Sequence, residues 1–193
     1  MGRAGRNGVF LSDEDLLGAY VRGDSAAASE IVDRYAAGVL RLAARMLGNS
    51  ADAEEVTQEV MLRLWKFAPD WQPGRAKVST WIWRVTVNLC TDRLRKAGST
   101  SLDLTPELKD GGPSPSDRIM DSERVEALYR SLDELPERQR TAVVLRHIEG
   151  MSNPEVAGIL ETSVDAVESL LTRGMRELRR RLGPRRDELG WKA

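Results

Sequence analysis

The sequence predicts an all-α fold: two small helical domains joined by a flexible linker, with a helix-turn-helix in the C-terminal one. Three observations carry this prediction. Apolar residues recur at intervals of three and four along most of the chain, which is the spacing of one face of a helix. Ser, Asp and Gly stand where such segments begin and end. Strict alternation of apolar and polar residues, the pattern of a half-buried strand, is absent.

The linker is indicated by composition. Residues 98–117 hold three Gly and three Pro with little apolar periodicity. Such a segment buries too little apolar surface to offset the entropy lost on ordering. We therefore expect a domain over 1–97, a flexible linker over 98–118 and a second domain over 119–193.

Four helices are expected before the linker. Ser12 can cap a short helix that ends near Gly23. Asp24 or Ser25 can cap the next, which the pair at 48–49 ends.

The third and fourth helices flank an irregular loop. Ser50 can cap the third helix, and Pro69 with the Pro-Gly pair at 73–74 marks the loop at about 68–78. Ser79 then opens the fourth helix, which runs to about Lys96.

The C-terminal part predicts a helix over 119–132 and another from Pro136 to Ile148. Ser152 and Glu155 have the spacing of a capping box. The short turn at 161–163 separates that helix from a last one over 164–182. Two helices joined by a three-residue turn, the second rich in basic residues, form the helix-turn-helix pattern.

Composition excludes several classes of protein. The chain has 193 residues, a net charge of −1, one Cys and one His, so neither an internal disulfide nor a zinc-ligand cluster is expected. No nucleophile elbow or phosphate-binding loop is present, which argues against an enzyme, a cofactor and a catalytic metal. No apolar run approaches the ~20 residues that span a bilayer. We expect a soluble, cytoplasmic protein.

An acidic run covers residues 52–59. Asp52, Glu55 and Glu59 step by three and four, so they line one stripe of a helix. The run is either a solvated helix face or a docking surface for a basic partner.

Four of the five Trp residues lie within 65–83. Trp65 and Trp81 are interpreted as core residues. Trp71 lies in the Pro-bounded loop close to Arg75 and Lys77. An aromatic ring beside cations is what unstacked single-stranded bases require, although a packing role combined with solubility is equally consistent with the pattern.

Seven Arg and a single acid lie between residues 173 and 186. Clustered Arg next to a helix-turn-helix argues for contacts with DNA phosphates. The alternative is a solvated basic tail.

These three patches, in this order and spacing, resemble a bacterial RNA polymerase sigma factor of the small extracytoplasmic-function (ECF) group in the sigma-70 family. The resemblance covers about residues 12–182. DAEEVTQEVMLRLW resembles the core-binding helix, PGRAKVSTWIWRVTVNLCTDRLRK the promoter-melting loop and helix, and LPERQRTAVVLRHIEGMSNPEVAGIL the fourth sigma region.

The resemblance implies partners and roles. The partners are core RNA polymerase, through its β′ clamp helices and β flap, promoter DNA, and an anti-sigma factor. The polymerase-binding residues would be Asp52, Glu54, Glu55, Gln58 and Glu59. The residues for the minus-ten element would be Trp71, Arg75, Lys77, Arg84, Asn88, Arg93 and Arg95. Those for the minus-thirty-five element would be Ser163, Asp165, Ala166, Glu168, Ser169, Thr172, Arg173 and Arg176.

Two positions of the last helix depart from the family's pattern, since Glu168 and Leu170 stand where basic residues are usual. The turn at 160–162 also lacks the usual Gly. These departures keep two alternatives open: a sigma-like mimic that binds an anti-sigma factor without recognising promoters, and a stand-alone helix-turn-helix regulator.

Overall fold

A computed structural model describes residues 11–97 and 127–185, and within these ranges it contains helices and no strand. The predicted linker and most of the predicted 119–132 helix lie outside the described residues. The described part of that helix covers 127–133. The other elements are α1 (Asp13–Val21), α2 (Ser25–Leu47), α3 (Ser50–Phe67), η1 (Ala68–Asp70), α4 (Val78–Ala97), α6 (Glu137–Val143), η2 (Val144–Ile148), α7 (Asn153–Ile159), α8 (Val164–Leu182) and η3 (Gly183–Arg185).

Local capping explains the first helix boundaries. Ser12 and Asp15 form a capping box at the start of α1, and Asp24 accepts a hydrogen bond from the Ala26 amide at 2.9 Å. Gly48 ends α2 in the left-handed conformation, with a φ of 66°. These boundaries confirm the sequence prediction, because side-chain oxygens and a Cβ-free residue satisfy the helix ends.

Three predicted boundaries differ by one residue. Asn49 caps α3 in place of Ser50, since its side-chain oxygen accepts hydrogen bonds from the amides of Ala51 and Asp52. The helix α4 begins at Val78, one residue before Ser79. Pro136 precedes α6 as its N-cap residue. The predicted helix from Pro136 to Ile148 is also divided, because its second half is η2, a π-helical turn that continues α6.

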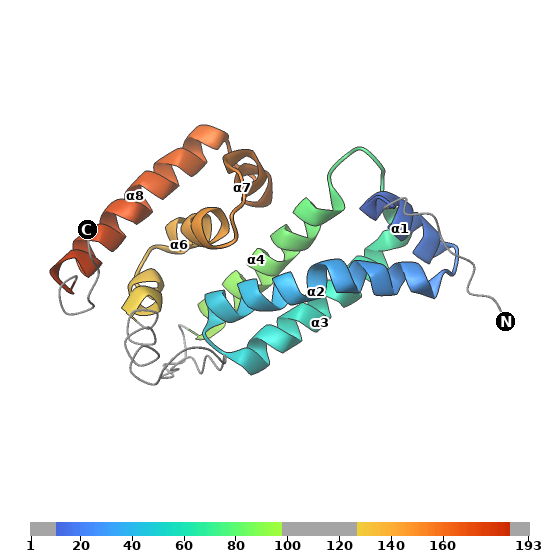
Figure 1. Cartoon of the computed structure of the whole chain (residues 1–193), viewed down its shortest axis with the longest axis horizontal. Helices are drawn as coiled ribbons and strands as arrows, with labels where there is room; N and C mark the ends of the chain where they lie inside the picture. Colours follow the sequence, from blue (N-terminus) through green and yellow to red (C-terminus); the bar gives the residue numbers. More distant parts are fainter. Residues whose placement is uncertain (1–10, 98–126, 186–193) are drawn as a thin grey trace, which may run out of the picture.

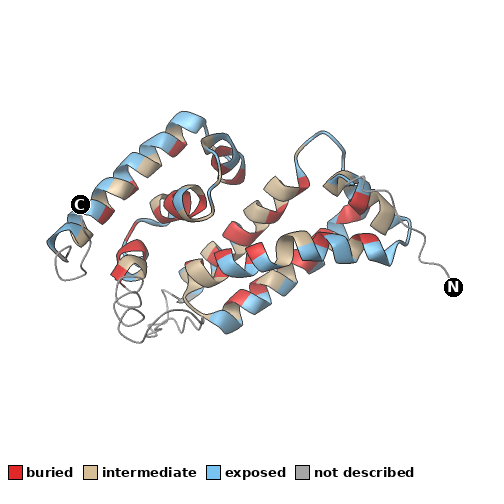
Figure 2. Ribbon diagram, in the orientation of Figure 1, coloured by how far each residue is buried: buried red, intermediate tan, exposed pale blue. Residues whose placement is uncertain are grey.

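The N-terminal helices form a bundle in which α2, α3 and α4 lie side by side (Figure 1). Their buried faces point inward, whereas the outer faces are exposed (Figure 2). The short α1 is fixed to α2 by Asp13, which accepts hydrogen bonds from Arg34 and Tyr35.

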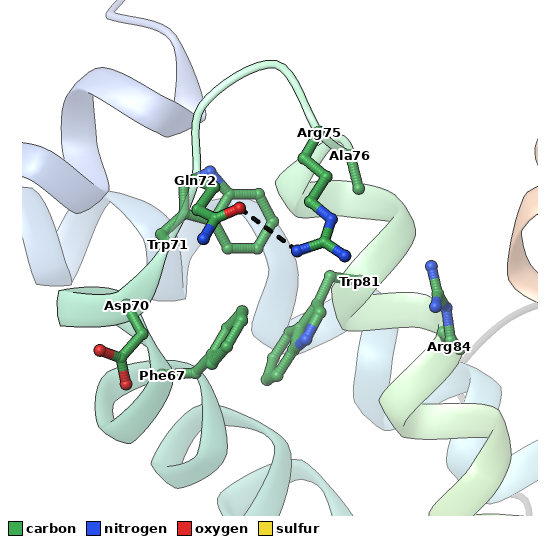
Figure 3. A pocket seen from close by; sticks show the side chains of 8 residues that line it. All are labelled: Phe67, Asp70, Trp71, Gln72, Arg75, Ala76, Trp81 and Arg84. Atoms are coloured by element: carbon green, nitrogen blue, oxygen red, sulfur yellow. Dashed lines mark hydrogen bonds between the residues drawn. The ribbon is translucent and has the colours of Figure 1, made fainter.

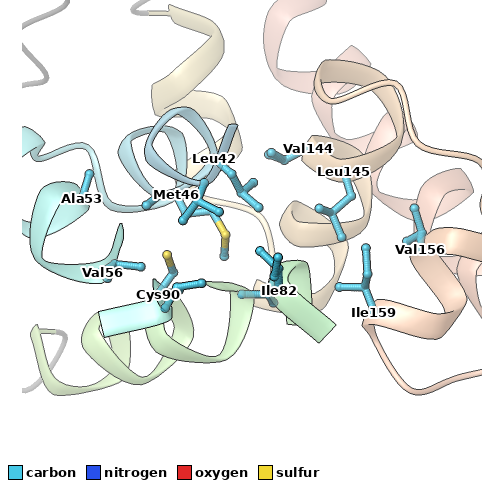
Figure 4. Packing of buried hydrophobic residues seen from close by; sticks show 14 of the residues in the cluster. Leu42, Met46, Ala53, Val56, Ile82, Cys90, Val144, Leu145, Val156 and Ile159 are labelled. Carbon is cyan, nitrogen blue, oxygen red and sulfur yellow. The ribbon is translucent and has the colours of Figure 1, made fainter. Parts of the chain in front are cut away.

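The C-terminal helices pack on the N-terminal bundle along α4, where α7 makes the contact (Figure 1). Ile82 of α4 and Ile159 of α7 are both buried, and they belong to one apolar cluster that also contains Leu42 and Leu145 (Figure 4). The hydrophobic core therefore runs from one set of helices into the other within the described residues.

Apolar periodicity predicts that five residues pack the two helices of the helix-turn-helix together: Val156, Ala157, Leu160, Val164 and Val167. Val156, Ala157 and Val167 are buried and Leu160 is half-buried, but Val164 is 37% exposed, so its side chain is not part of this contact. The capping box of Ser152 and Glu155 is confirmed, and α8 has the predicted bounds. On its inner side α8 packs on α6, where Gly174 allows a close approach to Val143.

Candidate functional site

A cavity of about 560 Å³ lies between the end of α3, the loop after η1 and the start of α4 (Figure 3). Phe67 ends α3, Trp71 follows η1, and Trp81 lies in the first turn of α4. Pro69 and the left-handed Gly74, with a φ of 79°, bend the chain around this space. The lining residues are Phe67, Asp70, Trp71, Gln72, Arg75, Ala76, Trp81 and Arg84.

Three aromatic rings form the apolar part of the cavity. The Phe67 and Trp81 rings are stacked, with centroids 5.5 Å apart and an interplanar angle of 5°. The Phe67 and Trp71 rings meet edge to face at 5.9 Å. Such a set of rings offers π-faces on which an unstacked base can lie. Trp81 thus packs against the core, as predicted, and also lines the cavity.

Phe67 is a functional candidate that sequence reasoning missed. Its place on the apolar face of a helix indicates core packing, yet it is 38% exposed. The signal available in the sequence was its position as the last residue before the Pro-bounded loop that carries Trp71.

Arginine side chains supply the polar part of the cavity. Arg75 donates a hydrogen bond to Gln72 at 3.2 Å. The buried Nε of Arg84 and the indole N–H of Trp71 have no hydrogen-bond partner among the described residues. Buried donors are normally satisfied, so these two are candidates for contacts with a bound ligand.

Of the other residues predicted for the minus-ten element, two are exposed and two are paired with acidic side chains. Lys77 lies at the end of the loop and Asn88 is exposed on α4. Arg93 instead lies between α3 and α4, where it donates hydrogen bonds to Asp52 and Glu55, both at 3.1 Å. Arg95 pairs with Asp92 on its own helix. The structure brings Trp71, Arg75 and Arg84 together and leaves Arg93 and Arg95 outside the cavity.

The acidic stripe forms one wall of a groove between α3 and α4. Glu55, Gln58 and Glu59 line it together with apolar Leu62 and Leu89. Leu62 is 52% exposed, a large value for a leucine on a helix. Asp52 contributes through its ion pair with Arg93, whereas Glu54 is exposed and is not among the residues that line the groove.

The charge of this groove is partly balanced from within the chain. Arg63 donates to Glu59 at 2.7 Å, and this hydrogen bond is the main reason that the pKa of Glu59 lies below its usual value. Carboxylates around an exposed leucine fit a partner that is basic and partly apolar.

The exposed face of α8 carries a shallow hollow lined by Asp165, Glu168, Ser169, Thr172 and Arg173. Five predicted minus-thirty-five residues therefore share one surface. Ala166 is half-buried and Arg176 is exposed. Ser163 caps the helix, accepting a hydrogen bond from the Ala166 amide at 3.1 Å.

The two departures on α8 have different environments. Glu168 lies in the hollow, on the face predicted to meet DNA. Leu170 is half-buried and packs against the hydrophobic core, so its side chain is part of the fold. Beyond the hollow, Glu177 pairs with Arg180 and Arg181, whereas Arg176 and Arg179 are exposed.

Within residues 11–97 and 127–185, no group of three or more His, Cys, Asp or Glu side chains is placed to hold a metal ion. None of the helices described there combines the length and the apolar character that crossing a membrane requires.

Comparison with known protein families gives two matches. Residues 31–100 match the model of sigma-70 region 2, and residues 125–178 match the model of sigma-70 region 4. The first match contains the acidic stripe, the aromatic cavity and α4, and the second contains the helix-turn-helix.

Curated relatives extend these matches. The ECF RNA polymerase sigma factor SigE of Mycolicibacterium smegmatis is 37% identical over 164 residues, which is 81% of this chain and 63% of that protein. The ECF RNA polymerase sigma factor SigW of Bacillus subtilis is 32% identical over 172 residues, covering 83% of this chain and 91% of that protein.

Solved structures have the same fold. CnrH in complex with the cytosolic domain of CnrY has a TM-score of 0.66 and 26% identity, over 89% of this chain and 97% of CnrH. The sigma factor RpoE bound to the anti-sigma factor NepR from Bartonella quintana has a TM-score of 0.64 and 16% identity, over 80% of this chain and 96% of that chain.

Proposed function

Since this chain belongs to the sigma-70 family of RNA polymerase sigma factors, in its extracytoplasmic-function group, we propose that it binds core polymerase, recognises promoters and opens them. The observation that carries the proposal is the cavity in which Trp71 lies beside the stacked Phe67 and Trp81, with Arg75 and Arg84 at its edge. Rings beside cations can hold a base that has left the duplex together with its phosphate.

Promoter opening requires a compensating interaction. Unstacking a base from a duplex costs a few kcal/mol, and stacking on aromatic side chains contributes about 1–3 kcal/mol per base. Stacking on the three rings of this cavity can therefore offset the free energy that unstacking one base costs. The unpartnered donors of Trp71 and Arg84 add hydrogen bonds that form only when a ligand is bound.

Two further surfaces complete the proposed mechanism. The groove of Glu55, Gln58, Glu59 and Leu62 docks on a basic, partly apolar helix pair, which we assign to the β′ clamp helices of polymerase. The exposed face of α8 enters the major groove of the minus-thirty-five element. In this proposal residues 1–97 and 119–193 act as two domains, and the linker at 98–118 spans them.

Regulation by an anti-sigma factor follows from the family. We propose that such a partner, with the chain in the cytoplasm, covers the polymerase groove or the helix-turn-helix until a signal releases it. No catalytic step is assigned to the chain, because the chemistry of transcription belongs to polymerase.

Run-off transcription with core polymerase on a promoter library tests the proposal. The wild-type chain should direct initiation from a defined set of promoters, and Trp71→Ala should abolish permanganate-reactive melted thymines while retaining polymerase binding. Trp71→Phe is the matched control, since it keeps a π-face and should retain most melting.

Two outcomes would redirect the assignment. Tight duplex binding as a dimer without polymerase would indicate a stand-alone regulator. Binding to an anti-sigma factor with no promoter footprint would indicate a sigma-like mimic. Failure to bind core polymerase would exclude the sigma factor itself.

A further inference from the structure

In the part of the chain that the structure describes, the ion pairs of Arg84 with Glu161 and of Arg45 with Glu149 connect the N-terminal bundle to the C-terminal helices. Arg84 of α4 donates to Glu161, in the turn between α7 and α8, at 2.6 Å. Arg45 of α2 pairs with Glu149, which follows η2. Both carboxylates come from the helix-turn-helix side, and both arginines come from the bundle.

Glu161 has an unusual backbone. Its φ is 49°, and among the described residues it is the only one other than glycine with a positive φ. This left-handed conformation favours Gly, because a Cβ is crowded there. The turn nevertheless carries a residue with a long acidic side chain, and that side chain reaches the other set of helices.

The partner of Glu161 belongs to the proposed DNA-binding cavity. Arg84 lines that cavity together with Trp71 and Arg75. While Glu161 holds the Arg84 guanidinium, one cation of the cavity is neutralised. The Glu161 carboxylate also places a negative charge where a DNA phosphate would approach. The carboxylate and the phosphate therefore compete for the Arg84 guanidinium.

Apolar packing keeps the turn close to α4. Ile82 and Ile159 are buried in the same cluster, and Gly158 lies close to Thr80, where an added Cβ would stand 3.4 Å from the Thr80 Cγ2 atom. Hydrogen bonds from Ser152 are the main reason that the pKa of the Glu155 carboxyl lies below its usual value. The positive charge of Lys77 lowers that pKa further. Lys77 of the loop and Arg84 of α4 therefore each face an acid of the helix-turn-helix side.

We propose that Glu161 is an autoinhibitory latch: in the free chain it holds Arg84 and closes the helix-turn-helix against α4. A DNA strand entering the cavity displaces Glu161 from Arg84, so strand capture and domain opening are coupled. The latch rests on the proposed function, since it assumes that Arg84 meets DNA. The pair is solvent-accessible, with side-chain exposures of 27% for Arg84 and 67% for Glu161, so it is a weak and reversible contact.

The closed state can be measured on the full-length free chain by energy transfer between dyes at Lys66→Cys and Arg179→Cys. The native Cys90 is buried, and its pKa is raised to about 12, so it does not compete for the dyes. Glu161→Gln removes the charge and keeps the backbone strain of the wild type, whereas Glu161→Gly removes the charge and also relieves the strain, because Gly adopts a positive φ without steric cost. Glu137→Gln is the control, because it removes one exposed charge elsewhere in the C-terminal helices.

Both Glu161 variants should lower the transfer efficiency and raise the affinity for a fluorescent dT oligonucleotide about two- to fivefold, the range expected for an exposed ion pair. The charge exchange Arg84→Glu with Glu161→Arg should restore the transfer efficiency that Glu161→Arg alone loses. Thermal melting followed by circular dichroism verifies that each variant is folded.

The latch is wrong if the Glu161 variants match Glu137→Gln in both measurements. A lower transfer efficiency with unchanged oligonucleotide affinity would equally overturn its inhibitory role. The distance measurement needs neither polymerase nor a promoter. A chain that closes through Glu161 but directs no transcription would therefore contradict the proposed function and leave the closure intact.

Discussion

Arg93 of α4 donates a hydrogen bond to Asp52 of α3 at 3.1 Å, and the same guanidinium reaches Glu55 at an equal distance. The resemblance assigns Arg93 to promoter DNA and the two acids to polymerase. In the folded chain the three side chains form one ion-pair cluster, so the two proposed surfaces meet at this arginine.

Replacing Arg93 should strengthen polymerase binding. Arg93→Gln leaves Asp52 and Glu55 without their cation, so the groove becomes more negative and more attractive to a basic partner. The dissociation constant for core polymerase should fall about two- to fivefold at low salt, with a steeper salt dependence. Fluorescence anisotropy over a salt series measures both quantities.

Arg63→Gln is the matched control, because Arg63 neutralises Glu59 in the same groove through a hydrogen bond of 2.7 Å. The two variants should act in the same direction. Weaker polymerase binding by Arg93→Gln would instead mean that the arginine itself contacts polymerase.

Glu168 is exposed in the hollow of α8, and its substitution should change promoter recognition. Glu168→Lys replaces an acceptor with a donor, and one good side-chain–base contact is worth about 1–3 kcal/mol of discrimination. Binding to a library of minus-thirty-five elements should shift in affinity or in preferred base. Unchanged selection would place Glu168 away from the bases.

Gly174 packs where α8 crosses α6, so a larger residue there should destabilise the fold. A Cβ at this position would stand 2.8 Å from the Val143 Cγ2 atom and 3.5 Å from the Gln139 carbonyl oxygen. Gly174→Ala should lower the free energy of unfolding by about 1–3 kcal/mol. Urea denaturation measures the change.

Gly183→Ala offers the matched control, because a Cβ at Gly183 meets nothing within 4 Å. Its unfolding free energy should equal or slightly exceed that of the wild type. Equal losses from both substitutions would show that the approach of α8 to α6 does not set the effect, because the higher helix propensity of Ala would by itself stabilise both variants.

Cys90 should link stability to high pH. Burial is the main cause that raises the pKa of its thiol from 9.0 to about 12. Between these two pH values the folded chain retains the thiol proton that the unfolded chain loses. The contribution of Cys90 to the free energy of unfolding is therefore fully present below about pH 9 and is lost as the pH rises toward 12. Cys90→Ala should show less loss of unfolding free energy between pH 8.5 and 10.5.

Thiol labelling gives an independent measurement of the same burial. At pH 8 a disulfide reagent should leave Cys90 unmodified in the native chain and react with it in denaturant. Rapid labelling of the native chain would contradict the buried position.

The sequence by itself determined the helical fold, most helix boundaries and which segments carry acidic, aromatic and basic side chains. Capping residues such as Ser12 and Gly48 act on neighbours within a few positions, so the helix ends that they set can be predicted from the local sequence. The sequence also indicated Trp71 and Arg75 as a possible site, since both belong to one loop.

Tertiary structure decided which of these groups meet. Phe67 and Trp81 are 14 positions apart, and only the packing of α3 against α4 stacks their rings. The pairing of Arg84 with Glu161 spans 77 positions, and it exists because Ile82 and Ile159 are buried together. Periodicity reports which face of a helix is apolar, but not which helix covers that face. The environment of each charge therefore depends on contacts between distant segments.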